Sequence, residues 1–349
     1  MSRTTVGVLL AIGLLFATSA CGVAREGPPG TTTLLIGDSY PPTHPASRDG
    51  VKFFMARAGE LSGGRLRFEY FPSAQLGKAE DHLTLTRSGA VDIGVVSPPY
   101  LSDRMPLSNV ADLPGMSTSA CAPAAALTGL MGEGGILAEQ EYTPQQLRML
   151  FVGVQPNYEV MTTGAVVTEP SDMAGLQLRS SGGVLDQAVQ ALGAAPVSIA
   201  GPEMYEAMAR GTVDGTALPP MSATPYRLDE VATNATSGAP LGSFTLTYAV
   251  SDRAWDRLPE DLRGVLAQAG QETTRHLCTA IEEENRVSRT SLEQGGLRFT
   301  ELTDSQVRAW QDALAPVREQ WVTDMEGRGL PGRAALDAMQ AGLAGADRG

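Results

Sequence analysis

Arg179 is the residue whose type and position best suit the binding of a small anion. It follows a short segment, Leu176-Gln177-Leu178, that we interpret as a strand, and a glycine-containing turn leads from it into a helix starting near Val184. In open α/β proteins, ligands bind outside the carboxyl ends of strands. A guanidinium there offers a rigid fork of donors that matches a carboxylate, and the helix start adds N–H groups. Position alone also allows an exposed arginine or one paired for structural reasons.

Other chemically capable residues show no catalytic or metal-binding arrangement. The histidines, His44, His82 and His276, lie in no metal-ligand spacing, and the sequence has no nucleophile elbow, P-loop or EF-hand loop. Residues 327–332 match GxGxxG but follow a predicted helix instead of a strand, so we interpret them as a helix stop. We expect no metal, no cofactor and no enzymatic activity; a catalytic triad assembled from distant residues remains the alternative.

The elements that must position Arg179 alternate between strand and helix patterns, which favours parallel α/β layers. The strand-like segments are residues 33–37, 65–70, 91–96, 149–154, 159–163 and 176–178. The last third of the chain is predicted to be mainly helical, with long helices over residues 262–281 and 307–321. Thr303 and Gln306 fit a capping box before the second of these helices, whose tryptophan stripe we assign to packing.

One strand-containing unit occurs twice. Residues 88–92 followed by Ser97-Pro98-Pro99-Tyr100 match residues 210–214 followed by Leu218-Pro219-Pro220-Met221. In each copy, a helix ends on a glycine, an apolar strand follows, and two prolines stop the strand. The repetition predicts two similarly built lobes that present strand ends to a shared cleft, although helix-glycine-strand is also a common chance pattern.

The composition argues against nucleic acid as a partner. The chain has 349 residues, with 26 Lys and Arg against 39 Asp and Glu, which gives a formal net charge of −13. Such a charge repels phosphate backbones, and the arginines are scattered instead of forming a basic stripe. The length and a hydrophobic content of 42% predict about two globular domains.

The N-terminus has the features of an export signal. Arg3 precedes an apolar stretch from Val6 to Ala17, which is too short to span a membrane. We predict a signal peptide over residues 1–20, a lipidated Cys21 and a tether over residues 21–32, so the protein would be exported and held at a membrane surface. Cleavage after Ala20 without lipidation is the alternative, because Thr18 stands where lipoprotein signals usually have leucine.

Besides Cys21, the predicted mature chain has two cysteines, Cys121 and Cys278. Neither belongs to a CxxC or Cys/His cluster, which argues against a metal site. An oxidising compartment permits a disulfide between them, and two buried free thiols are the alternative.

Seven short motifs occur in the order seen in the solute-binding proteins of tripartite ATP-independent periplasmic (TRAP) transporters. They are Tyr40-Pro41-Pro42-Thr43-His44-Pro45, Gln75-Leu76-Gly77, residues 88–93, Asp112-Leu113-Pro114, residues 172–179, Leu192-Gly193-Ala194 and residues 203–215. The sequence resembles this family over roughly residues 32 to 300. The resemblance implies an α/β, two-lobed periplasmic-binding-protein fold with long C-terminal helices. It also implies a cleft that closes on a small organic acid and delivery of that acid to membrane permease subunits.

The resemblance implies a role and a setting for Arg179. In that family the arginine at this position holds the ligand carboxylate. The two-lobed fold would divide this chain into lobe I, residues 33–155 plus about 242–285, and lobe II, residues 156–241 plus about 286–345. Many relatives carry an asparagine where this chain has Leu218, so we expect a less polar acid than a C4-dicarboxylate. The other candidate cleft residues are Tyr40, His44, Ser97, Tyr100, Gln155, Asn157, Met221 and Phe244. A ligand-sensing ectodomain or an extracytoplasmic enzyme are the alternative functions.

Overall fold

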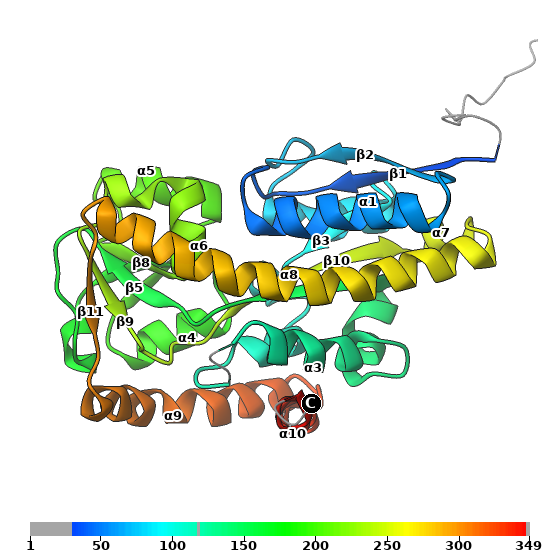
Figure 1. Cartoon of the computed structure of the whole chain (residues 1–349). Helices are drawn as coiled ribbons and strands as arrows, with labels where there is room; N and C mark the ends of the chain where they lie inside the picture. Colours follow the sequence, from blue (N-terminus) through cyan, green and yellow to red (C-terminus); the bar gives the residue numbers. More distant parts are fainter. Residues whose placement is uncertain (1–29, 117–118, 347–349) are drawn as a thin grey trace, which may run out of the picture.

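The computed structural model describes residues 30–116 and 119–346, which form two β-sheets surrounded by helices (Figure 1). The predicted signal peptide, Cys21 and most of the predicted tether lie outside the described residues. Among the described residues, no helix is both long and apolar enough to cross a membrane.

The first sheet has the strand order β2-β1-β3-β10-β4. Its strands are β1 (Thr32–Gly37), β2 (Leu66–Phe71), β3 (Ile93–Val96), β4 (Leu147–Gln155) and β10 (Phe244–Ser251). The helices that accompany it are α1 (Lys52–Leu61), α2 (His82–Ser88), α3 (Cys121–Met131) and the short α7 (Asp252–Asp256). This sheet and its helices form the first lobe.

The second sheet has the order β11-β9-β5-β8-β6-β7. Its strands are β5 (Glu159–Thr162), β6 (Gln177–Ser180), β7 (Ala195–Ser198), β8 (Gly215–Leu218), β9 (Asn234–Ser237) and β11 (Arg298–Glu301). Its accompanying helices are α4 (Val184–Ala191), α5 (Met204–Ala209) and α6 (Pro220–Ala223). These elements form the second lobe, so the expected two-lobed α/β architecture is confirmed.

Both sheets are mixed, which corrects the expectation of purely parallel layers. In the first sheet β10 runs antiparallel to both β3 and β4, and in the second sheet β5 runs antiparallel to β8 and β9. The physical reason is that the chain crosses between the sheets over residues 156–158 and 238–243, and again between β10 and β11, so a returning strand inserts against its new neighbours. Every residue of β10 is buried, although its sequence alternates apolar residues with Thr, Ala and Ser as a half-exposed strand does.

The repeated unit has the same structure in both lobes. Gly89 and Gly211 adopt left-handed conformations, with φ of 77° and 67°, after their helices. In the first lobe, the Asp92 carboxylate accepts the N–H of Leu35 at 2.9 Å; in the second, the Asp214 carboxylate accepts the N–H of Gln177 at 2.8 Å. Each aspartate thus ties its strand to the adjacent parallel strand, and the chain that follows each strand reaches the boundary between the lobes.

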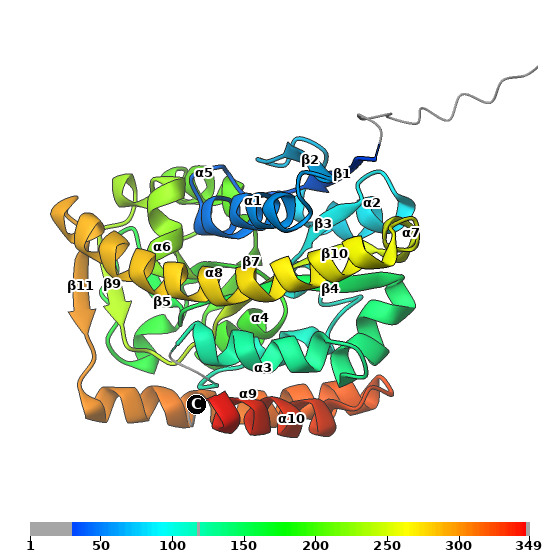
Figure 2. The same cartoon turned by 45° about the vertical axis from the view of Figure 1, so that its right-hand side comes forward.

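Long C-terminal helices connect the lobes. Helix α8 (Glu260–Gln294) extends along both sheets, and α9 (Asp304–Gly327) returns beneath them to α10 (Gly332–Ala346), which packs on α3 (Figures 1 and 2). The predicted capping box is present, since the Thr303 and Gln306 side chains bond each other's backbone N–H groups. Trp310 and Trp321 are 0% and 1% exposed, as expected for packing residues.

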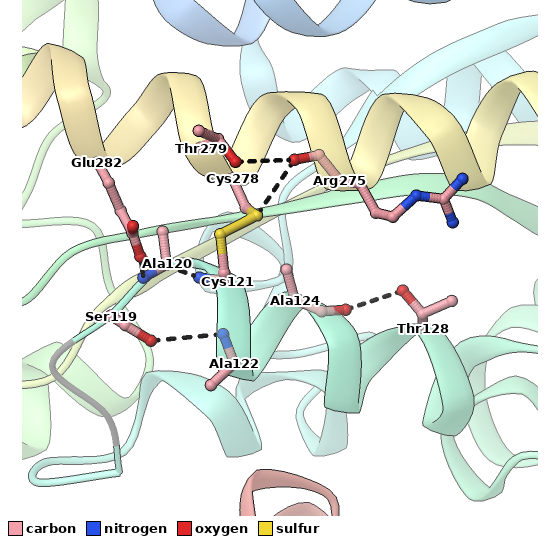
Figure 3. The surroundings of a disulfide bond; sticks show 10 residues. All are labelled: Ser119, Ala120, Cys121, Ala122, Ala124, Thr128, Arg275, Cys278, Thr279 and Glu282. Atoms are coloured by element: carbon pink, nitrogen blue, oxygen red, sulfur yellow. Dashed lines mark hydrogen bonds between the residues drawn. A yellow bond between two sulfur atoms is a disulfide. The ribbon is translucent and has the colours of Figure 1, made fainter. Parts of the chain in front are cut away.

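A disulfide joins Cys121, the first residue of α3, to Cys278 in α8, with a Cα–Cα distance of 4.9 Å (Figure 3). The Glu282 carboxylate, one helical turn beyond Cys278, accepts the N–H of Ala120 at 3.1 Å and that of Cys121 at 3.4 Å. A carboxylate at this place satisfies N–H groups at the helix start and complements the helix dipole. The disulfide and Glu282 together fasten α3 to the middle of the helix that runs along both lobes.

Candidate ligand-binding site between the lobes

A small cavity of about 30 Å³ lies between the two lobes. Its lining includes seven of the residues expected in the cleft: Tyr40, His44, Tyr100, Gln155, Arg179, Leu218 and Phe244. Tyr158, Gly201, Met204, Ser222 and Tyr226 complete the lining. Among the described residues, no Asp, Glu or Lys lines this cavity, so Arg179 supplies its formal charge.

Arg179 lies inside β6 instead of after it, which corrects the expected strand end by two residues. The strand extends to Ser180 because it pairs in parallel with both β7 and β8. The Arg179 side chain is 3% exposed, and its Nε donates to the carbonyl of Ile199 at 2.7 Å. The backbone therefore holds the guanidinium plane in place.

The guanidinium of Arg179 has donors to spare. Nη2 donates to the Tyr100 hydroxyl at 3.1 Å, while Nη1 makes no hydrogen bond to any residue that the structure describes. No carboxylate among residues 30–116 and 119–346 forms an ion pair with it. The nearby Asp186 is engaged by the Ser180 hydroxyl, and burial raises the pKa of Asp186, an effect that the charge of Arg179 partly offsets. A buried, unpaired guanidinium is costly, so an anion in the cavity would stabilise it.

Tyr100 is a second donor beside Arg179. Its hydroxyl oxygen accepts hydrogen bonds from Arg179 Nη2 and, at 3.3 Å, from the N–H of Gly201. Because the oxygen is acting as acceptor in both bonds, its own proton is free to be donated. Arg179 and Tyr100 can therefore both donate to one carboxylate.

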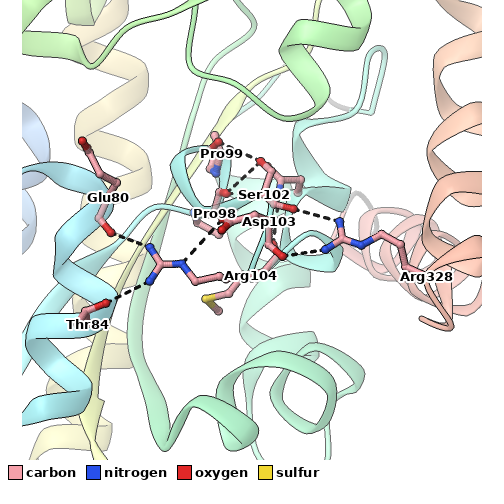
Figure 4. Close-up of polar contacts among 10 residues, drawn as sticks. Glu80, Thr84, Pro98, Pro99, Ser102, Asp103, Arg104 and Arg328 are labelled. Carbon is pink, nitrogen blue, oxygen red and sulfur yellow. Dashed lines mark hydrogen bonds and ion pairs between the residues drawn. The ribbon is translucent and has the colours of Figure 1, made fainter.

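The turn that carries Tyr100 is held from two sides (Figure 4). This turn, Pro98–Leu101, follows β3, and the prolines limit its backbone. On one side Arg104 donates to the Glu80 carbonyl at 2.8 Å and to the Thr84 hydroxyl at 3.1 Å. On the other, Arg328 at the end of α9 donates to the carbonyls of Ser102 and Asp103 at 3.2 and 2.8 Å. The position of Tyr100 thus depends on both the first lobe and the C-terminal helices.

Aromatic rings form much of the remaining wall. Tyr40 stacks on His44 with a centroid distance of 4.4 Å, and Tyr100 meets Phe244 edge to face at 5.3 Å. Burial raises the pKa values of the Tyr40 and Tyr226 hydroxyls, so both stay protonated and neutral at neutral pH. These faces suit a flat apolar body next to the carboxylate.

Polar groups from three elements meet in another part of the lining. His44 Nε2 lies 3.4 Å from the Ser222 hydroxyl, which donates to Gln155 Oε1 at 3.1 Å. Burial, with a smaller contribution from the positive charge of Arg48, lowers the pKa of His44 to about 3. His44 is therefore neutral at physiological pH and adds no second positive charge.

Tyr226 also borders a larger outer pocket of about 350 Å³, which is lined mainly by apolar and proline residues of both lobes. Close to this pocket, Lys78 of the first lobe forms a 3.0 Å ion pair with Glu203 of the second. Glu203 stands at the start of α5, and through this pair it also makes a contact between the lobes. Both side chains are more than half exposed, so the pair contributes little energy by itself.

Three of the candidate cleft residues lie outside the cavity lining. Ser97 and Met221 are 1% and 0% exposed and pack behind it, and Asn157 has a buried Oδ1 without a hydrogen-bond partner among the described residues. Their chain neighbours Tyr158 and Ser222 line the cavity instead. The expected segments thus border the cavity, but which of their residues faces it is set by turns, which do not follow a strand's alternation. Tyr226, by contrast, carries no local signal that could have identified it.

The chain matches the family model for bacterial extracellular solute-binding proteins, family 7, over residues 36–324. It is 28% identical over 317 residues to the C4-dicarboxylate-binding periplasmic protein DctP of Rhodobacter capsulatus, covering 88% of this chain and 92% of that protein.

Solved structures of similar proteins have the same fold. A TRAP solute-binding protein from Rhodoferax ferrireducens, in complex with copurified benzoate, matches with a TM-score of 0.84 and 25% identity over 91% of this chain and 99% of that one. One from Bordetella bronchiseptica, with bound (R)- and (S)-mandelate, matches with a TM-score of 0.81 and 25% identity over 90% and 99%. The relatives are named as solute receptors, not as enzymes. This chain therefore belongs to bacterial extracellular solute-binding protein family 7, whose members are exported receptors of TRAP transporters.

Proposed function

We propose that this receptor binds a compact monocarboxylate with an apolar, ring-containing body and delivers it to the permease subunits of a TRAP transporter. The observation that carries the proposal is the buried guanidinium of Arg179, which has no carboxylate partner among the described residues and lines a cavity of aromatic side chains. The ligand carboxylate accepts from Arg179 and Tyr100, while the rings of Tyr40 and Phe244 flank its body.

Leu218 supports a monocarboxylate over a C4-dicarboxylate. It is 3% exposed at the end of β8 and lines the cavity with a purely apolar side chain. A second carboxylate there would lose its hydration without gaining a donor, which costs at least about 1–3 kcal/mol. The ligands of two relatives, benzoate and mandelate, also combine one carboxylate with a ring.

The ligand enters and leaves through movement of the two lobes. The cavity is small and its lining is largely buried, so the lobes must separate to admit an acid. We place the lobe boundaries as residues 33–155 plus about 242–285 and residues 156–241 plus about 286–345, since the chain changes sheets near these positions. Contacts made to both lobes only when the cleft is shut shift the population toward the closed form. Small-angle scattering should show a smaller radius of gyration with ligand.

Membrane attachment through a lipid on Cys21 completes the proposed function. The apolar stretch before the Ala20-Cys21 junction supports it. Mass spectrometry of the protein from its native host should find a modified N-terminal Cys21, and an unmodified residue would leave a freely diffusing receptor.

A thermal-shift screen over organic acids tests the ligand class. Benzoate, phenylacetate and mandelate should stabilise the protein more than succinate, malate or fumarate. A ligand at 100 times its dissociation constant adds about 2.7 kcal/mol of stability. Submicromolar binding of succinate, or no response to any ring-containing monocarboxylate, would refute the proposal.

A further inference from the structure

The hydrogen-bond chain through His44, Ser222 and Gln155 has a defined direction. His44 Nδ1 accepts the N–H of Ala46 at 3.1 Å, so in the neutral ring the proton is on Nε2. Nε2–H faces the Ser222 oxygen at 3.4 Å, and the Ser222 hydroxyl donates onward to Gln155 Oε1 at 3.1 Å. The direction of the chain fixes which end of the Gln155 amide faces Ser222.

This direction leaves an unused donor at the cavity. With Oε1 turned to Ser222, Gln155 Nε2 has no hydrogen-bond partner among the residues that the structure describes. Gln155 is 5% exposed and lines the cavity. Nδ1 of His44, the Ser222 oxygen and Gln155 Oε1 each already face a donor. This part of the cavity is therefore ready to donate to a ligand oxygen.

We infer that the ligand carries a neutral oxygen substituent, a hydroxyl or a carbonyl, that lies away from its carboxylate and accepts a hydrogen bond from Gln155 Nε2. This inference rests on the proposed function, because it describes the part of the same acid that Arg179 does not hold. An alkyl substituent in its place would leave the buried amide N–H unpaired. A second carboxylate there would gain no positive charge from His44, which is neutral. The inference narrows the proposed ligand class from ring-containing monocarboxylates to those that also carry a neutral oxygen substituent.

Matched acids separate the contribution of the oxygen from that of the ring. The three hydroxybenzoates and the three methylbenzoates share the carboxylate and have similar volumes. Calorimetry on the full mature chain should show that the best hydroxybenzoate binds about tenfold or more tightly than its methyl counterpart. Equal or tighter binding of the methyl acid would overturn the inference.

Variants then assign the preference to Gln155. In Gln155→Leu the ratio of the two affinities should fall to within about threefold of one, because the donor is gone. Gln190→Leu, at an exposed position of α4, is the matched control and should keep the wild-type ratio. Ser222→Ala frees the Gln155 amide to rotate, so it should lower the ratio of hydroxybenzoate to methylbenzoate affinity in part. This variant gives an independent measurement if Gln155→Leu does not fold.

The outcomes separate this inference from the proposed function. If hydroxyl and methyl acids bind equally, and both depend on Arg179, the monocarboxylate receptor stands and the oxygen preference is refuted. A hydroxyl preference that persists in Gln155→Leu and in Ser222→Ala refutes the role of Gln155. If none of the six acids binds, the proposed function fails and this inference fails with it.

Discussion

Replacing Arg179 with alanine should abolish most of the binding of the cognate acid. The side chain is 3% exposed, Nη1 is unengaged by the described residues, and Nη2 shares the Tyr100 hydroxyl, so a carboxylate can take two parallel hydrogen bonds. Truncating one partner of a buried charge pair costs about 2–5 kcal/mol, which corresponds to a loss of about 30- to several-thousand-fold in affinity. Arg179→Lys keeps the charge but loses the planar fork and the Nε bond to Ile199, so it should recover only part of the affinity.

Calorimetry with benzoate as the first probe measures these losses, and urea unfolding of each variant confirms that the fold is intact. Arg308→Ala, at an exposed position of α9, is the matched control and should bind as the wild type does. If Arg179→Ala bound the acid within about threefold of wild type, the guanidinium would not hold the carboxylate, and the assigned site would be wrong.

Leu218→Asn should improve binding of succinate relative to benzoate by roughly tenfold, because it supplies a donor where the cavity is apolar; an unchanged ratio in calorimetry would contradict the role of Leu218. Tyr226→Ala should join the inner cavity to the outer pocket and admit 4-phenylbutyrate, and continued exclusion of this acid in a thermal-shift assay would argue against Tyr226 as the limit on ligand length. Burial raises the pKa of Glu159 to about 7 in the folded protein, above its unfolded value. The contribution of this group to the free energy of unfolding is therefore largest below about pH 4.5 and falls by up to about 3 kcal/mol as the pH rises through 7. Denaturant unfolding of Glu159→Gln should therefore depend less on pH between 5 and 8 than that of the wild type, and an identical dependence would refute this. Cys278→Ser should lower the unfolding free energy by roughly 2–5 kcal/mol, because the disulfide to Cys121 closes a long loop; non-reducing peptide mapping that finds free thiols in the wild type would contradict the bond.

Several elements near the site could be predicted because their signals are local. Glycines at helix ends, alternating side chains in β2 and the capping box of α9 depend on residues a few positions apart. The same holds for Leu218, which ends a short apolar strand before two prolines. Such signals located the strand ends of both lobes, and hence the segments that border the cavity.

The direction of β10 and the mixed sheets had no such signal. The sequence of β10 alternates apolar residues with Thr, Ala and Ser, which is typical of a half-exposed strand, yet both faces of this strand are buried. Its antiparallel direction follows from where the chain re-enters the first sheet, and that depends on the whole path through the second lobe.

The sequence by itself determined the family, the two-lobed α/β class and the arginine that suits a carboxylate, because these depend on ordered motifs and local periodicity. Only the tertiary structure decided what surrounds that arginine. Tyr100 is 79 residues from Arg179, and His44 is 178 residues from Ser222, yet each pair is in contact across the lobes. Such contacts arise from the packing of two sheets along one shared helix, and no short stretch of sequence specifies the orientation of one lobe on the other.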